Sequence, residues 1–231
     1  MNEIGFDLIS DLYLDPNDSF NWEGKATSLY CIVAGNISND SRTIIGTLGH
    51  LSHFYQGVFY VPGPLEFINK SSIIDYTELL TTGTRKIQNV ANLYHNVIII
   101  EGIAILGVTG WTGNIDESID NDQLIEASYH DLVYLQSSIA RLQRHLDVKQ
   151  IVVVTCGVPN KALYYKEEPD IVNHQLPLVT ALSSDSENKV SHWLFGNHEK
   201  VIDAHIEGIH YVNNPYLKRR PYWAKRITIN L

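Results

Sequence analysis

The sequence contains few cysteines and few basic residues. Only Cys31 and Cys156 occur among its 231 residues, and each lies in an apolar run. Two thiols so far apart exclude the disulfide framework of a small secreted domain, and we expect both to be buried and reduced. Lysine and arginine total 17 against 26 aspartates and glutamates, which gives a formal net charge of −9. A protein that coats duplex DNA is usually basic, so nucleic acid is not an expected partner.

Long apolar runs are also missing. No stretch approaches the roughly 20 apolar residues that a membrane helix needs. The first residues, MNEI, lack the basic and apolar regions of a signal peptide. We therefore expect a cytoplasmic or otherwise intracellular protein with no membrane partner. Hydrophobic residues make up 44% of the chain, which is typical of a globular protein, and the length predicts one domain over residues 1–231.

Short apolar runs that end in polar or glycine-rich turns alternate with helical patterns. Strands are predicted over residues 6–10, 28–34, 57–61, 97–101, 103–108, 151–155, 193–195, 204–206, 209–213 and 226–230. Helices are predicted over residues 44–55, 122–145 and 176–184, with Asp120 or Asp122 capping the second. Strands this apolar are typical of sheets buried on both faces, and the alternation predicts an α/β fold.

Seven short blocks at the predicted strand ends carry a family resemblance. They are SDLYLD (10–15), VAGNIS (33–38), VPGPLEF (61–67), GVTGWT (107–112), VVTCGVP (153–159), FGNHE (195–199) and VNNPY (212–216). Their order and spacing resemble the calcineurin-like metallophosphoesterases, most closely the small single-domain bacterial and phage branch. The blocks of that branch read SDLHLE, AGDI, PGNHE, a block with tryptophan, VTHHAP, GHTH and NP. The resemblance covers nearly the whole chain.

The resemblance implies a four-layer αββα sandwich, in which helices flank two packed mixed sheets. It also implies a site at the carboxyl ends of the strands. In active relatives, aspartate, histidine and asparagine hold two divalent metals there, and a metal-bound hydroxide attacks phosphorus.

The first half of the motif set keeps one of the ligands that the resemblance implies. Asp11 matches the first aspartate, but Tyr13 stands at the position of the first histidine and Asn36 at that of the bridging aspartate. Pro64 replaces the asparagine of the third motif, and Leu65 replaces the histidine that protonates the leaving group. Proline offers no side-chain ligand, leucine cannot act as an acid, and a neutral amide is a poor bridge for two cations.

The second half has lost its ligands as well. Cys156 stands at the position of a metal-binding histidine, while Asn197 and Glu199 replace the two histidines of the last motif. His198 falls between them, at a position that varies in the family. The expected protein is thus a pseudoenzyme without a cofactor, which keeps the fold as a binding or scaffold module. A role as a phage or other assembly component agrees with the bacterial and phage branch that the chain resembles. If the protein is viral, it could be associated with the virion.

Two alternatives stay open. Asp11, Cys156, His198 and Glu199 could form a rearranged site for one zinc or manganese ion, which would make the protein a metal-dependent phosphoesterase. The remaining cleft could instead bind a phosphate or nucleotide ligand without cleaving it. If neither holds, Asp11 needs hydrogen-bond donors in place of metals, and we expect Asn36, Asn197 and Tyr13 to fill that space.

Two segments that mix aromatic and charged residues are candidates for contact with a protein partner or a second copy. The segment 216–226 near the C-terminus contributes Lys218, Arg219, Arg220, Tyr222 and Trp223. The second segment contributes Tyr164 and Tyr165. Aromatic and arginine side chains are enriched in interfaces, although the acidic remainder of the chain favours a solvated loop for the basic cluster.

Overall fold

The computed structural model describes residues 3–112, 115–163, 178–182, 188–216 and 222–231. The first of two sheets has the strand order β11-β1-β2-β3-β4. Its strands are β1 (Glu3–Ile9), β2 (Tyr30–Ala34), β3 (Gly57–Val61), β4 (Val90–Asn92) and β11 (Lys225–Asn230). β1 to β4 are parallel, and β11 pairs with β1 in the antiparallel direction.

The second sheet has the order β5-β6-β7-β8-β10-β9. It consists of β5 (Asn96–Ile100), β6 (Ile103–Val108), β7 (Gln150–Thr155), β8 (Val190–Phe195), β9 (Asp203–Ile206) and β10 (Ile209–Asn213). The four central strands are parallel, and the edge strands β5 and β9 are antiparallel to their neighbours. Both sheets are therefore mixed.

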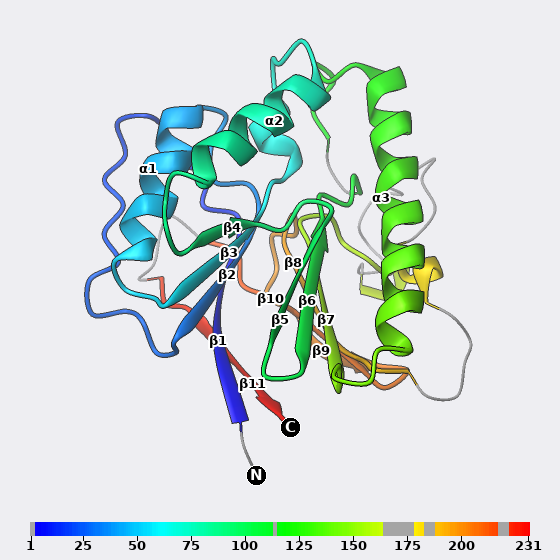
Figure 1. Ribbon diagram of the computed structural model, residues 1–231. Coiled ribbons are helices and arrows are strands. Elements are labelled where there is room, and N and C mark those ends of the chain that lie inside the picture. Colours follow the sequence, from blue (N-terminus) through cyan, green and yellow to red (C-terminus); the bar gives the residue numbers. More distant parts are fainter. Residues whose placement is uncertain (1–2, 113–114, 164–177, 183–187, 217–221) are drawn as a thin grey trace.

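Helices cover the outer faces of the two sheets (Figure 1). α1 (Ser41–Ser52) and α2 (Ile73–Thr84) lie beside the first sheet, and α3 (Asn121–Gln143) runs along the second. The structure thus confirms the predicted four-layer αββα sandwich. None of the helices in the described ranges combines the length and the apolar character that crossing a bilayer requires.

Side chains of the central strands belong to hydrophobic cores on both faces of the sheets. On β7, Val152 and Val154 point into the core between the sheets, whereas Ile151 and Val153 point into the core under α3. This is the reason that the strands are apolar at consecutive positions rather than at alternate ones. Cys31 and Cys156 are both buried free thiols, as predicted.

One buried carboxylate fixes α3 to the second sheet. Asp131 accepts a hydrogen bond from the backbone nitrogen of Gly110 at 2.8 Å, and its other oxygen lies 2.8 Å from Nε2 of His95. The bond to Gly110 holds the loop after β6, which carries the buried Trp111. A helix in the outer layer therefore positions a loop at the strand ends.

Several predicted elements agree with the structure, and others need correction. β3, β6 and β10 have the predicted bounds, and Asp120 caps α3 by accepting from Gln123 N. α1 begins three residues before its predicted start because Asp40 caps it through Thr43 N. The predicted helix 176–184 is wrong where the structure describes it: residues 178–181 form a short 3-10 turn, η3 (Leu178–Ala181).

Two elements, α2 and β4, were not predicted. α2 leaves Ile74 71% exposed and Leu79 49% exposed, so its apolar residues do not follow one buried stripe. β4 has only three residues, too few for an alternating pattern to be visible. Their formation depends on contacts with α1 and β3 rather than on local sequence.

Three histidines form a row across the edge of the second sheet. His192 on β8 pairs in register with His210 on β10, and His210 pairs with His205 on β9. The rings of His205 and His210 stack with centroids 4.1 Å apart, and His210 Nε2 lies 2.6 Å from Asp203 Oδ1. Burial, together with the neighbouring His210 and His205, lowers the pKa of His192 from 6.5 to about 4.

The lowered pKa of His192 predicts a loss of stability in mild acid. Between pH 6.5 and pH 4 the unfolded chain binds a proton at this residue and the folded chain does not, so stability falls as the pH falls. His192→Gln is expected to reduce this loss by about 1 kcal/mol at pH 5. Thermal unfolding at pH 7, 6 and 5 measures it, with His53→Gln at the exposed end of α1 as the control. Parallel pH curves for wild type and His192→Gln would contradict the prediction.

Candidate functional site

The carboxyl ends of four strands from both sheets meet at one place. Asp11 and Asn36 follow β1 and β2, while Cys156 and Asn197 follow β7 and β8. Backbone hydrogen bonds join these ends: Asp11 N donates to Gly35 O at 3.1 Å, and Gly196 N donates to Cys156 O at 2.9 Å. The structure therefore brings together most of the positions that the sequence motifs single out.

Four site residues have left-handed backbone conformations. The φ angles are 55° at Asp11, 48° at Tyr13, 56° at Asn36 and 53° at Asn197. Asparagine and aspartate tolerate this region, but it is unusual for tyrosine. The turns bring the side chains of Asp11, Asn36 and Asn197 within hydrogen-bonding distance of one another or of one another's backbone. Backbone strain of this kind persists only where the surrounding contacts fix it.

Asp11 is buried and accepts hydrogen bonds at both of its oxygens. Its Oδ1 accepts from Asn36 Nδ2 at 2.9 Å and from the backbone nitrogen of Asn197 at 2.8 Å. Its Oδ2 accepts from Ser10 Oγ at 2.9 Å. Burial raises the pKa of Asp11 to about 6, and these hydrogen bonds oppose the rise. The carboxylate is thus held by protein donors.

The carboxamide of Asn36 occupies the centre of the site. Its Oδ1 accepts from Leu65 N at 3.1 Å, and its Nδ2 lies 2.9 Å from Asp11 Oδ1 and 3.2 Å from Asn197 Oδ1. Rotating the amide would place its oxygen against both of those oxygens, so the network fixes its orientation. Asn36 therefore points a hydrogen-bond donor at the carboxylate.

The expectation that three side chains replace the metals around Asp11 is confirmed in part. Asn36 donates from its side chain as expected, but Asn197 donates from its backbone. The Asn197 side chain instead donates to Thr112 O at 2.9 Å. Tyr13 does not donate to Asp11; its hydroxyl accepts from Asn36 Nδ2 at 3.2 Å. The interaction of Tyr13 with the carboxylate therefore passes through Asn36.

Cys156 is packed against the backbone at Gly35 and Gly63. A Cβ atom at Gly35 would lie 2.6 Å from Cys156 Sγ, and one at Gly63 would overlap the same sulfur. Burial raises the pKa of the thiol well above its usual value, and the charges of Asp11 and Glu66 raise it further. A thiol without its negative charge is a poor nucleophile and a poor metal ligand.

His198 and Glu199 do not join Asp11 and Cys156. His198 is buried, and its Nδ1 lies 3.0 Å from Lys200 O, while Glu199 is exposed. Within the part of the chain that the structure describes, no three histidine, cysteine, aspartate or glutamate side chains are grouped so that they could hold a metal ion. The four residues of the rearranged single-metal hypothesis thus do not form a group.

The two divalent cations that the resemblance implies do not fit the donors at this site. A cation needs lone pairs from oxygen, nitrogen or thiolate ligands. Here Asn36 presents an N–H group, the sulfur of Cys156 is enclosed by the backbone at Gly35 and Gly63, and Pro64 and Leu65 have no side-chain donor atoms. The Asp11 carboxylate lies at the centre, and protein donors contact both of its oxygens.

Glu66 is a site residue that the sequence analysis missed. It is fully buried and accepts from four donors: Asn36 N, Ile37 N, Gly63 N and Tyr60 Oη, at 2.8 to 3.2 Å. Burial raises its pKa to about 7. The available signal was the final glutamate of the PGNHE block, which VPGPLEF retains at this position. Glu66 joins the loops after β2 and β3, so its contacts are structural.

A shallow pocket lies above this network. Its volume is about 280 Å³, and its lining consists of Tyr13, Asn36, Pro64, Leu65, Ile68, Ile115, Asp116 and Asn197. None of these described residues is lysine, arginine or histidine, and Asp116 adds a carboxylate. The described lining is therefore apolar, amidic and acidic, and it holds no cation that would attract a phosphate.

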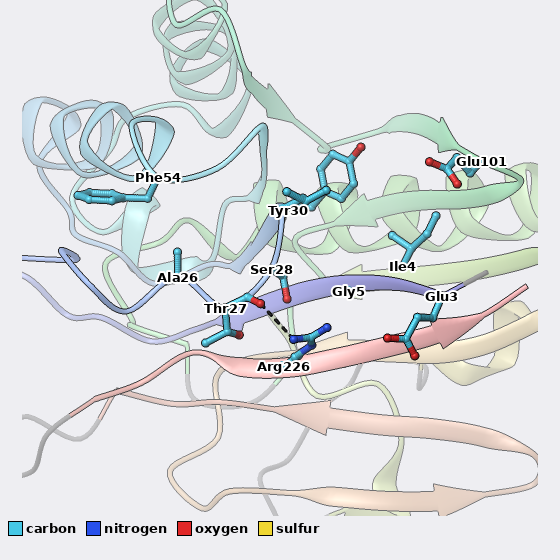
Figure 2. A pocket seen from close by; sticks show the side chains of 11 residues that line it. Glu3, Ile4, Gly5, Ala26, Thr27, Ser28, Tyr30, Phe54, Glu101 and Arg226 are labelled. Atoms are coloured by element: carbon cyan, nitrogen blue, oxygen red, sulfur yellow. Dashed lines mark hydrogen bonds between the residues drawn. The ribbon is translucent and has the colours of Figure 1, made fainter. Parts of the chain in front are cut away.

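A larger pocket of about 500 Å³ lies at the opposite ends of the parallel strands. Figure 2 shows it beside the starts of β1 and β2, with Glu3, Tyr30, Glu101 and, from β11, Arg226 around it. Arg226 Nη1 donates to Thr27 O at 3.2 Å, which ties its guanidinium to the wall. This pocket includes none of the predicted site residues.

The candidate partner-binding residues differ in their exposure to solvent. Tyr222 is buried: its hydroxyl donates to Asn214 O and accepts from Ser10 N, and its ring packs 5.1 Å from Tyr216. Assigning Tyr222 to a partner surface is therefore wrong, because its contacts are internal. Trp223 is 59% exposed. The other candidates lie outside the described residues: Tyr164, Tyr165, Lys218, Arg219 and Arg220.

Comparisons with known proteins give similarity at the level of the fold. No family model matches the sequence, and no curated protein matches it. A crystal structure of phosphopantetheinyl hydrolase from Mycobacterium tuberculosis matches with a TM-score of 0.63 at 15% identity, over 97% of this chain and 96% of that one. A putative 5'-nucleotidase from Staphylococcus aureus matches with a TM-score of 0.58 at 13% identity. It covers 99% of this chain, which spans 51% of the nucleotidase chain. These similarities support a metallophosphoesterase-like fold.

Replacing the buried Asp11 carboxylate is expected to stabilise the protein. Above its folded pKa of about 6 the residue is charged and buried, at a cost on the order of 2 kcal/mol relative to the unfolded chain. Asp11→Asn keeps an oxygen for Asn36 and Asn197, and its new N–H group can donate to Ser10 Oγ. We expect a higher Tm at pH 8, with a smaller gain at pH 5. A lower Tm at pH 8 would contradict this.

The same substitution at Glu66 is expected to stabilise the protein less than Asp11→Asn, because a lost acceptor offsets the removal of the buried charge. Three of its four donors are backbone N–H groups, which cannot become acceptors, so Glu66→Gln turns one amide hydrogen toward a donor. A buried donor left without its acceptor costs about 1–3 kcal/mol. Urea unfolding at pH 8 measures the difference, with Asp11→Asn as the matched comparison. Equal changes in the free energy of unfolding for Asp11→Asn and Glu66→Gln would contradict this difference between the two carboxylates.

Proposed function

We propose that this protein is a catalytically inactive metallophosphoesterase-like protein, which uses the fold as a binding or scaffold module. The single observation that carries the proposal is the orientation of the Asn36 amide. The N–H group of Asn36 faces Asp11. In the family that the chain resembles, a carboxylate that bridges two metals stands at the position of Asn36. A phosphoesterase of that family needs metal ligands at this point.

The remaining positions support the same function. Leu65 stands at the position of the leaving-group acid and cannot transfer a proton. Cys156 packs against Gly35 and Gly63 rather than facing the shallow pocket, which does not include it in its lining. The buried Glu66 and the bonds between the loops keep the strand ends together without metals. These contacts support a fold that does not depend on catalytic ions, as a scaffold requires.

The alternative function is metal-dependent phosphoester hydrolysis with a single ion. The observation that favours it is the kind of protein with which the chain shares its fold: a phosphopantetheinyl hydrolase and a putative 5'-nucleotidase. A fold can host unrelated functions, so the side chains carry more weight than the similarity. Binding of a phosphate or nucleotide without cleavage is less well supported, because the described pocket lining has no basic side chain.

The metal content of the purified chain tests the proposal. The chain is incubated with Mn²⁺ or Zn²⁺ and desalted, and bound metal is measured by mass spectrometry. A calorimetric titration with the same ions detects weaker binding. We expect far less than one equivalent of either ion and no hydrolysis of bis(p-nitrophenyl) phosphate.

Asp11→Asn is the matched control, because it removes the one retained ligand while leaving the hydrogen-bond network intact. The proposal requires that wild type and this variant hold the same trace of metal. Close to one equivalent in wild type, lost in Asp11→Asn together with hydrolysis of the phosphodiester, would establish the single-metal enzyme instead.

A further inference from the structure

The outer face of α3 carries apolar side chains that the fold does not use. Ile125, Tyr129 and Val133 are 55%, 65% and 42% exposed. They are spaced by four residues, so they form one stripe along the helix. The opposite face already fills the core under α3 with Leu135, Ile139 and Leu142. Within the residues that the structure describes, these three large apolar side chains therefore stay on the solvent side of α3.

The charges on the same face are divided between its ends. Asp122 and Glu126 are exposed near the start of α3, and Arg141 and Arg144 are exposed at its end. Such an arrangement also balances the helix dipole. That balance accounts for the charges, but it does not account for the apolar stripe between them.

We infer that α3 is the contact helix of a symmetric dimer, in which it lies antiparallel to α3 of a second copy with Val133 at the two-fold axis. This register places Asp122 opposite Arg144 of the second copy, and Arg144 opposite its Asp122. A parallel pair would instead bring Asp122 against Asp122 and Arg144 against Arg144. Charge complementarity therefore selects a second copy in the antiparallel orientation.

The sizes of the side chains fit the same register. Tyr129 faces the level of Ser137 in the second copy, which is exposed and small, and Ile125 faces the level of Arg141, whose aliphatic stem can pack on an apolar side chain. Large residues opposite small ones allow two helices to approach closely. α3 has 23 residues and is about 35 Å long. The four exposed charges of the face sum to zero, so the net charge of −9 on each copy is not concentrated at the contact.

The surface is separate from the strand-end network. α3 lies in the outer layer beside the second sheet (Figure 1), and the proposed contact uses none of the residues around Asp11. The dimer is therefore independent of whether the strand-end site holds metal. Either result of the metal measurement leaves this inference to be tested on its own.

Sedimentation equilibrium of the full chain tests the dimer. Wild type is expected to give twice the 26.1 kDa of a single chain. Val133→Asp places two carboxylates together at the axis, and we expect it to weaken association by about tenfold or more. Thr82→Asp, which adds the same charge to an exposed position on α2, is the matched control and should leave the dimer intact.

A charge exchange tests the register. Asp122→Arg and Arg144→Asp should each weaken the dimer, because each places like charges opposite one another, and the double variant should restore it. Circular dichroism establishes that every variant is folded. A monomeric wild type, a Val133→Asp variant that dimerises like wild type, or a double variant weaker than both single variants would each overturn the inference.

Discussion

The strand-end region depends on one amide. Asn36 connects the two sheets by bonding to Asp11 after β1 and to Asn197 after β8, and it also accepts from Leu65 N. In a metal-dependent relative, cations would hold these ends together by attraction to several ligands. A neutral amide does the same with directional hydrogen bonds and needs only one carboxylate. The contacts at the strand ends therefore centre on a dipole rather than on a second carboxylate.

The close packing below this amide leaves little freedom for other arrangements. Cys156 occupies the space between the backbones at Gly35 and Gly63, where even a methyl group on either glycine would clash. Glu66 then ties the two loops together through buried hydrogen bonds. A histidine in place of Cys156 is much larger than the sulfur, so restoring that family ligand alone would require the loops to move apart. The packing around Cys156, as well as the set of side chains, therefore supports the proposed absence of catalytic ions.

The exposed apolar stripe of α3 lies away from the strand-end region. The pocket above Asn36 is small and has no basic group in its described lining. The outer face of α3 has a continuous stripe of exposed apolar residues with charges of opposite sign at its two ends. An association through this helix would leave the strand ends free. The fold can therefore serve as an assembly unit whether or not the strand-end region has a ligand of its own.

The sequence by itself determined the α/β class, and the family resemblance of its motifs implied the layers of the fold and the positions at the site. Apolar runs with turns at their ends identify most strands, and the motif order places Asp11, Asn36 and Cys156 at one edge, because parallel strands end on the same side. The tertiary structure decided which atoms face one another. Whether Asn197 acts through its side chain or its backbone, and whether Tyr222 is exposed or buried, depends on neighbours distant in the chain. No local pattern records those contacts, since they exist only once the two sheets pack.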